Sequence, residues 1–204
     1  MIEIPGFFTY DTKGRGDEVR PGRYSAVFVN MKKTWSRPDI ISSTAEKLAD
    51  LCRDSECIIG IESGGSPYAS LVASILKTNL VLARREAKTQ GGHLAGYISD
   101  AEKKFAVVDD VLATGESSER GSLVVNHGEN QIRIVSILSY GMDTFIAQKY
   151  GVEVTSLYQI DDILDCLDPD LQTELTPYVR AYQEKIHRMI ILGKYTDKDY
   201  ESKR

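Results

Sequence analysis

From about residue 39 the chain alternates between short apolar runs and longer segments in which apolar residues recur every three or four positions. Short apolar runs are typical of buried strands, and the wider spacing is typical of helices that bury one face. The pattern predicts strands at 57–61, 79–84, 105–110, 131–138 and 152–158, helices at 38–51, 68–77 and 144–151, and a turn followed by a helix over 114–128 that Gly128 closes. This alternation predicts an α/β fold in which a parallel sheet carries helices on both faces.

The last forty residues depart from this alternation. Thr176-Pro177 is a typical helix start, since threonine caps a first turn and proline fits the first helical position, and Gly193 is a typical stop. The segment between them is predicted to be a helix that packs on the core or on a partner. Its apolar stripe comprises Tyr178, Val179, Tyr182, Ile186, Met189 and Ile190.

The bulk composition fits one domain of ordinary size. The 204 residues are 42% hydrophobic and 27% charged, which is average for globular proteins. We divide the domain into an N-terminal segment (1–37), an α/β core (38–165) and a C-terminal helical extension (166–204). No apolar run approaches the roughly 18 residues that a membrane span needs. The first residues lack the basic and apolar blocks of a signal peptide, so the cytoplasm is the expected location.

Charge is distributed unevenly along the chain. The formal net charge of −5 argues against a nucleic-acid partner. Residues 1–37 nevertheless carry seven Lys or Arg against four acids, and residues 84–88 are RREAK. Local basic clusters in an acidic protein indicate a small anionic ligand. The three cysteines lack the spacing of a metal site.

Ligands of parallel α/β sheets bind beyond the carboxyl ends of the strands. That rule indicates the segments 61–67, 85–96 and 109–117 together, all of which are rich in glycine or charge.

The sharpest pattern is FAVVDDVLATGES (105–117), an apolar strand that ends in Asp109 and Asp110 before a loop of small residues and a helix. Carboxylates can accept hydrogen bonds from ribose hydroxyls, and the loop offers N–H groups and hydroxyls at a helix start, which is a phosphate-binding arrangement. Acids before a helix are also common in ordinary turns, where Asp110 would merely cap the helix.

The complete pattern resembles the signature with which type I phosphoribosyltransferases bind 5-phosphoribosyl 1-pyrophosphate (PRPP). GIESGGSP (60–67) similarly resembles the pyrophosphate loop of that family. The resemblance implies a phosphoribosyltransferase core with a small hood built from the terminal segments. It also implies Mg²⁺ as a cofactor that is bound through PRPP, with Asp109 and Asp110 as the candidates for a direct ligand. The PRPP-binding residues it implies are Ser63, Gly64, Gly65, Asp109, Asp110, Ala113, Thr114, Gly115, Glu116 and Ser117.

RREAKTQGGHLAG (84–96) resembles a segment of orotate phosphoribosyltransferases whose basic residues bind pyrophosphate and whose glycine-rich part closes over the partner subunit's site. The resemblance implies a homodimer, PRPP contacts from Arg84, Arg85 and Lys88, and a catalytic role for Lys88 with Asp109 and Asp110. Gln90 stands where that family carries histidine, and His93 is the nearby candidate to replace it.

Segment 20–33 resembles the base-binding loop of the same family, with Arg20 and Phe28 at base-contacting positions. A departure follows the strand at 131–138, where Ser139-Tyr140 replaces an Asp-Arg pair whose arginine holds the orotate carboxylate; Tyr140 thereby becomes a base-binding candidate. The expected reaction converts orotate and PRPP to orotidine 5′-phosphate and pyrophosphate. The alternatives are a phosphoribosyltransferase for uracil or a purine, and a non-catalytic PRPP sensor.

Overall fold

A computed structural model describes residues 8–10, 17–20, 23–25, 27–88, 92–123, 125 and 130–192. Its centre is a six-stranded sheet in the order β10-β9-β8-β5-β6-β7. The strands are parallel except β7, which runs antiparallel to β6. The predicted parallel sheet is therefore confirmed. Its strands are β5 (Cys57–Ile61), β6 (Asn79–Lys88), β7 (Gly92–Ala95), β8 (Lys104–Leu112), β9 (Gln131–Ser139) and β10 (Glu153–Gln159).

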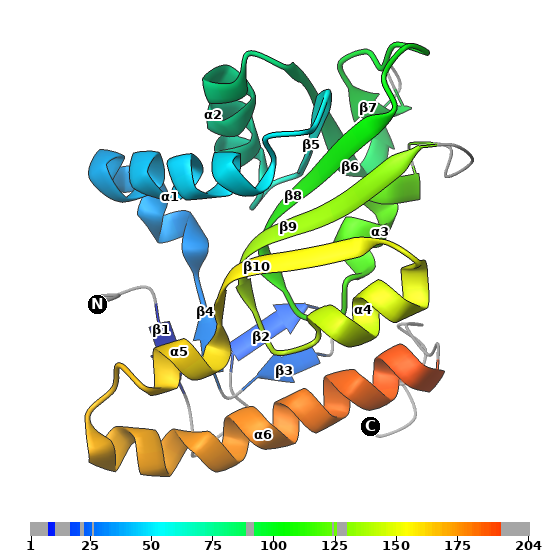
Figure 1. Ribbon diagram of the computed structural model, residues 1–204. Helices are drawn as coiled ribbons and strands as arrows, with labels where there is room; N and C mark the ends of the chain where they lie inside the picture. Colours follow the sequence, from blue (N-terminus) through cyan, green and yellow to red (C-terminus); the bar gives the residue numbers. More distant parts are fainter. Residues whose placement is uncertain are drawn as a thin grey trace.

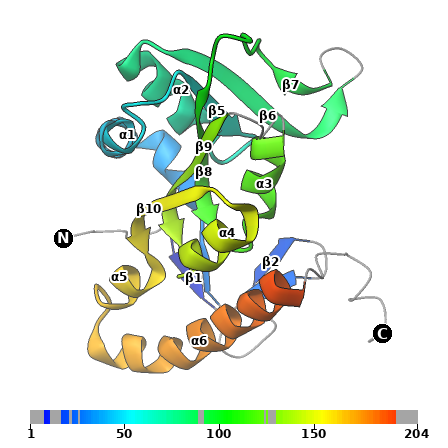
Figure 2. The same cartoon turned by 45° about the vertical axis from the view of Figure 1, so that its right-hand side comes forward.

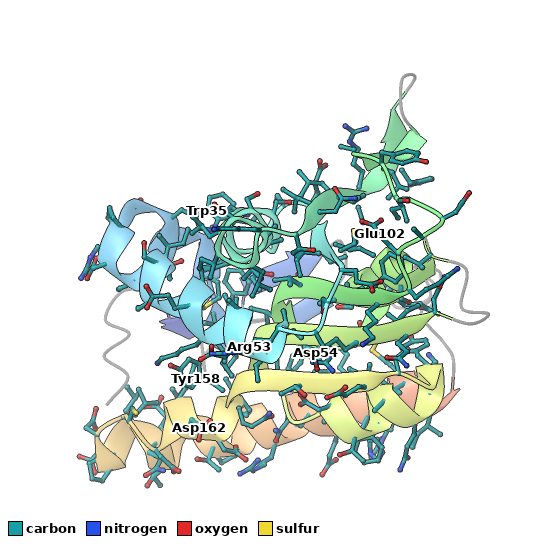
Figure 3. The ribbon with its side chains drawn as sticks, turned by 45° about the horizontal axis from the view of Figure 1, so that its top comes forward. Trp35, Arg53, Asp54, Glu102, Tyr158 and Asp162 are labelled. Carbon is teal, nitrogen blue, oxygen red and sulfur yellow. The ribbon has the colours of Figure 1, made fainter. Side chains whose placement is uncertain are left out.

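Helices cover both faces of the sheet, as the alternation predicted (Figures 1 and 2). Helices α1 (Pro38–Leu51) and α2 (Ser66–Leu76) pack on each other, and α2 contacts β5, β6 and β8. Helix α3 (Glu116–Leu123) contacts the same three strands and α4 (Asp143–Tyr150) contacts β10, from the other face. The strands between these layers supply a dry core, because β5 and residues 105–109 of β8 are buried throughout. At the sheet edge, Lys47 of α1 donates a 2.7 Å hydrogen bond to the hydroxyl of Tyr158. Figure 3 shows Tyr158 on β10, on the side of the sheet that α1 covers.

The two terminal segments lie together beyond the carboxyl ends of the central strands (Figure 1). The N-terminal part forms two small antiparallel pairs, one of β1 (Phe8–Tyr10) with β4 (Val27–Val29) and one of β2 (Asp17–Arg20) with β3 (Arg23–Ser25). A 3-10 helix, η1 (Met31–Ser36), then leads into α1. The C-terminal part consists of α5 (Ile160–Leu164) and α6 (Pro169–Leu192), and α6 contacts β4.

Three predicted boundaries were wrong. β6 continues four residues past Arg84 because it forms a hairpin with β7, in which Lys88 pairs with Gly92, and polar residues on such an arm resemble a loop. β8 continues past Asp110 to Leu112, since Val111 and Leu112 still pair with β9. Helix α3 ends at Leu123, well before Gly128, which lies outside the described residues.

Helix α6 begins at Pro169, not at Thr176-Pro177 as predicted. The chain contains two helix-start patterns, Asp168-Pro169 and Thr176-Pro177, and the earlier one starts the helix. The Asp168 carboxylate accepts the N–H of Leu171 at 3.0 Å. Pro177 lies inside the helix on its exposed side, where the hydrogen bond that proline cannot donate does no harm to the core. The stripe prediction holds at Val179, Ile186 and Ile190, which are buried, and fails at Tyr178, which is exposed.

None of the helices in the described part of the chain combines the length and the apolar character that a bilayer crossing requires.

The interior position of Pro177 generates a stability prediction. Pro177→Ala should stabilise the protein by about 1–2 kcal/mol, because an interior proline removes a helical hydrogen bond and crowds the preceding turn. For a chain of this size the gain is about 2–8 °C in melting temperature (Tm). Pro169→Ala is the control: it lies at the first helical position, where proline costs nothing, and should give no gain. Calorimetry measures Tm in both variants. Equal shifts of Tm would show that the interior position of Pro177 does not destabilise the helix.

Candidate active site

The strand order creates a switch point between two central strands. From β5 the chain crosses over through α2 to β6 on one side, whereas β8, β9 and β10 are added on the other side. Loops leaving the carboxyl ends of β5 and β8 therefore diverge and open a crevice. A cavity of about 400 Å³ lies there, within the range of small-molecule sites. It is lined by residues 28–32, 61–64 and 109–118, by Tyr140, and by Tyr182, Lys185, Ile186 and Met189 of α6.

The loop after β5 lies directly against the end of β8 because two of its residues are glycines. A Cβ on Gly64 would lie 2.2 Å from the carboxyl carbon of Asp110, and one on Gly65 would lie 2.2 Å from the carbonyl oxygen of Val108. A side chain at position 65 would push the two segments apart, and one at position 64 would displace the Asp110 carboxyl group. Ser63 and Gly64 line the cavity, whereas Gly65 does not line it and supports the loop from behind.

Asp109 and Asp110 lie inside β8, not in a turn after it, and consecutive strand residues point to opposite faces. Asp109 is 4% exposed; its carboxylate accepts the hydroxyl of Ser118 at 3.2 Å and the N–H of Asp110 at 2.9 Å. Asp110 is half-buried and its carboxyl group faces Gly64. Both residues line the cavity despite their opposite directions.

The charge on Asp109 is disfavoured in the ligand-free protein. Burial raises the pKa of the Asp109 carboxyl well above its usual range, and the nearby Asp110 carboxylate raises this pKa further. A cationic or hydroxyl-rich ligand that reaches this pair would therefore relieve an unfavourable interaction.

The segment between β8 and α3 has the geometry of an anion-binding turn. Gly115 has φ +75, a conformation that favours glycine, and it leads directly into α3 at Glu116. The first N–H groups of a helix have no partner within the helix, and they point out of its start. Ala113, Thr114, Glu116 and Ser117 line the cavity around this turn. The predicted phosphate-binding residues are thus brought together beside the acidic pair.

The two terminal segments, β1–η1 and α5–α6, together form what we call the hood. Residues 28–32 and α6 of the hood form the opposite wall of the cavity. Phe28 and Tyr140, two predicted base-binding residues, both line it. The Tyr140 ring meets the Tyr182 ring of α6 edge-on at 5.2 Å, and the backbone carbonyl of Tyr140 accepts a 2.9 Å hydrogen bond from Gln183. On the other side, the buried Tyr68 of α2 hydrogen-bonds to Thr34 and to the carbonyl of Met31, which fastens η1.

Segment 84–96, which the resemblance implied would close over a partner's site, contributes none of its described residues to the lining of this cavity. Arg84 does not line the cavity; its Nε lies 3.5 Å from the carboxylate of the lining residue Glu62, and the guanidinium also donates to the carbonyl of Leu94. His93 is exposed on β7, with Nδ1 3.4 Å from the carbonyl of Arg84. The backbones of Arg20, Arg85 and Lys88 belong to strands, but their side chains, like Gln90 as a whole, lie outside the described residues. Figure 2 shows the β6–β7 arm extending away from α6.

Helix α6 contributes to the cavity, which its apolar stripe did not predict. Tyr182, Lys185, Ile186 and Met189 all line the cavity, although the stripe predicted simple packing. One signal was present: Lys185 places a charge between apolar residues that face the protein.

This sheet order, with an acidic pair and a small-residue turn before a helix at the switch point and a hood above them, is the architecture of a type I phosphoribosyltransferase. No family model matches the sequence. The chain is 30% identical over 163 residues to an orotate phosphoribosyltransferase of Pyrobaculum aerophilum, which covers 77% of this chain and 84% of that protein.

Solved structures agree with this relationship. The orotate phosphoribosyltransferase of Aeropyrum pernix matches with a TM-score of 0.59 and 25% identity, over 70% of this chain and 84% of that chain. The Mycobacterium tuberculosis orotate phosphoribosyltransferase in complex with PRPP matches with a TM-score of 0.54 over 66% of this chain and 81% of that one, and its 16% identity shows the fold alone. The chain belongs to the orotate phosphoribosyltransferase family.

The raised pKa of Asp109 predicts a pH-dependent gain in stability for Asp109→Asn. As pH rises from about 4 toward the folded-state pKa, the unfolded chain ionises Asp109 first, so the free energy of unfolding falls with pH. An asparagine side chain does not ionise, so the variant avoids this fall in the free energy of unfolding, and its amide group can still hydrogen-bond Ser118.

We therefore expect the ligand-free Asp109→Asn variant to have a higher Tm than the parent at pH 7.5, with the difference shrinking toward pH 4. Asp54→Asn, at an exposed position after α1, is the control and should leave Tm unchanged at both pH values. Scanning calorimetry without phosphate measures both. A Tm difference that does not vary with pH would show that the charge on Asp109 is not the cause.

Proposed function

We propose that this protein transfers the phosphoribosyl group of PRPP to orotate, giving orotidine 5′-phosphate and pyrophosphate. One observation carries the proposal: the acidic pair of β8, the turn at 113–117 and the loop at 62–64 line a single cavity in a chain of the orotate phosphoribosyltransferase family. PRPP carries a phosphate, a ribose and a pyrophosphate, and each of these three segments suits one of them.

Each segment has a chemical task in this reaction. The N–H groups and hydroxyls of residues 113–117 bind the 5′-phosphate. Asp109 and Asp110 accept hydrogen bonds from the ribose hydroxyls and so orient the sugar. When the bond between the anomeric carbon and pyrophosphate breaks, its electron pair leaves with pyrophosphate and the ribose becomes positively charged. The two carboxylates then lie near developing positive charge, which they stabilise more in the transition state than in the substrate.

Magnesium fits this site as a companion of PRPP. Among the described residues no group of three or more His, Cys, Asp or Glu is placed to hold a metal. Mg²⁺ usually takes one or two protein carboxylates together with phosphate oxygens, and Asp109 and Asp110 are suitable donors. When bound, Mg²⁺ would neutralise charge on the leaving pyrophosphate.

The same cavity admits a second candidate, a phosphoribosyltransferase for an uncharged base such as uracil. The observation in its favour is Tyr140, an uncharged aromatic residue that lines the cavity directly after β9. Phe28 and Tyr140 offer ring surfaces that suit any pyrimidine.

An assay of pyrophosphate release with PRPP, Mg²⁺ and a panel of bases tests the function. We expect orotate to be turned over faster than uracil, adenine or guanine. The site control is the pair Asp109→Asn/Asp110→Asn, which should fold and lose at least about a hundredfold in calorimetric PRPP affinity, because two charge-assisted hydrogen bonds are lost, each worth roughly 1.5–3 kcal/mol. Faster turnover of uracil would favour the second candidate. Unchanged PRPP affinity in the double variant would disprove the site.

The predicted role of Lys88 leads to a proposal about a second copy of the chain. We propose a homodimer in which the β6–β7 arm of each subunit serves the site of the other. The proposal is supported by the positions of Arg84 and His93, which belong to this arm and do not line the cavity of their own chain. A basic group delivered to the departing pyrophosphate would act mainly on charge that develops in the transition state.

Lys88→Ala should therefore lower turnover by about a hundredfold or more while changing PRPP affinity little. Mixing Lys88→Ala chains with chains carrying Asp109→Asn/Asp110→Asn should restore activity. After random exchange at equal amounts, half of the dimers are hybrids with one intact site of two, so about a quarter of the parent activity should return. No recovery after subunit exchange has been verified by light scattering would contradict the shared site.

A further inference from the structure

The C-terminal helix α6 supplies one complete wall of the cavity. Tyr182, Lys185, Ile186 and Met189 lie three, one and three positions apart, which places them on one face of a helix. Ile186 is almost fully buried and Tyr182 and Met189 are half-buried, so this face is held firmly against the body of the protein. Lys185 lies on this face next to Ile186 and lines the cavity, although it is an exposed residue.

This wall adjoins Tyr140. Tyr182 packs edge-on against the Tyr140 ring, and Gln183 binds the carbonyl of Tyr140. Lys185 follows Tyr182 by three residues, which is about one helical turn. Tyr140, Tyr182, Ile186 and Met189 give this side of the cavity an aromatic and aliphatic lining that suits the ring of a base. Long lysine stems commonly lie along apolar surface while the ammonium group reaches a polar partner.

The charges in the cavity are divided between its walls. The wall next to the sheet carries Glu62, Asp109, Asp110 and Glu116. Of the described lining residues, the basic ones are Lys32 and Lys185, and both come from the hood. An anionic base that enters beside four acidic residues needs a cation on the hood side. No arginine follows β9 for forty residues, since the next one in the chain is Arg180.

We propose that Lys185 recognises the carboxylate of the base and makes α6 the element that selects an anionic pyrimidine. Lys32 lies on η1, whereas Lys185 lies on α6 about one turn from Tyr182, which packs on Tyr140, so we assign the role to Lys185. The inference rests on the proposed function, which it deepens by naming the residue that distinguishes orotate from uracil.

Two nucleotides isolate the carboxylate, because orotidine 5′-phosphate and uridine 5′-phosphate differ in that group alone. Their dissociation constants, measured by calorimetry, should favour orotidine 5′-phosphate in the parent. Lys185→Met keeps the stem and removes the charge, and it should reduce this preference by about tenfold or more while leaving affinity for uridine 5′-phosphate within about twofold. Lys185→Arg should retain most of the preference.

The matched control is Arg188→Gln, which removes a positive charge from the same helix. Arg188 does not line the cavity, its side chain is 77% exposed, and it pairs with Glu184 at 3.7 Å. This variant should bind both nucleotides as the parent does. In steady-state assays, Lys185→Met should raise the KM for orotate with little change in the KM for PRPP.

The outcomes separate the two proposals. If the parent turns over orotate and Lys185→Met keeps the full preference for orotidine 5′-phosphate, the role of Lys185 is overturned and the proposed function stays intact. Loss of the preference in Lys32→Met alone would likewise overturn it in favour of η1. A parent without any preference for orotidine 5′-phosphate and without orotate turnover would overturn the proposed function itself.

Discussion

The close approach of the β5 loop to the end of β8 is the constraint on which the site depends. Gly64 and Gly65 allow backbone to lie where a side chain would meet Asp110 or the carbonyl of Val108. This contact brings a loop suited to pyrophosphate next to carboxylates suited to ribose. A side chain at Gly65 would meet backbone and would separate the two segments, whereas one at Gly64 would displace the Asp110 carboxyl group. Precise placement of reacting groups is a large part of enzymatic rate enhancement, so this spacing has a direct catalytic meaning.

Electrostatics in the cavity follow from the same geometry. Asp109 and Asp110 are consecutive residues of β8, and their carboxyl groups pack against Ser118 and Gly64 respectively. Burial raises the pKa of Asp109, and the nearby Asp110 carboxylate raises it further. Such a pair is costly without a ligand and becomes favourable when hydroxyl groups and cations arrive. The protein thus gives up some stability at the site in exchange for affinity toward a charged sugar phosphate. The basic groups that balance these acids come from other parts of the fold, namely η1, α6 and, as we propose, the arm of a second subunit.

The hood differs from the core in how it is built. The central strands β5 and β8 are largely buried, whereas β1–β4 form short two-stranded pairs. Helix α6 contacts β4, and Tyr68 hydrogen-bonds to the carbonyl of Met31 in η1. The residues that we propose for the base, Phe28, Tyr140 and Lys185, come both from the hood and from the position directly after core strand β9.

The sequence by itself determined the elements and the contiguous motif. Apolar periodicity located β5 at both of its ends and β6, β8, β9 and β10 within a few residues, but it missed β7, whose residues are part of a glycine-rich segment. The acidic pair with its small-residue loop is a local pattern that needs no tertiary context. Tertiary structure decided the rest. An apolar stripe at helical spacing has the same appearance whether it faces a core or a cavity, so the position of Lys185 in the site followed only from where α6 docks. Likewise, competing helix starts at Asp168 and Thr176 were resolved by packing, because Leu175 is buried before the second signal is reached.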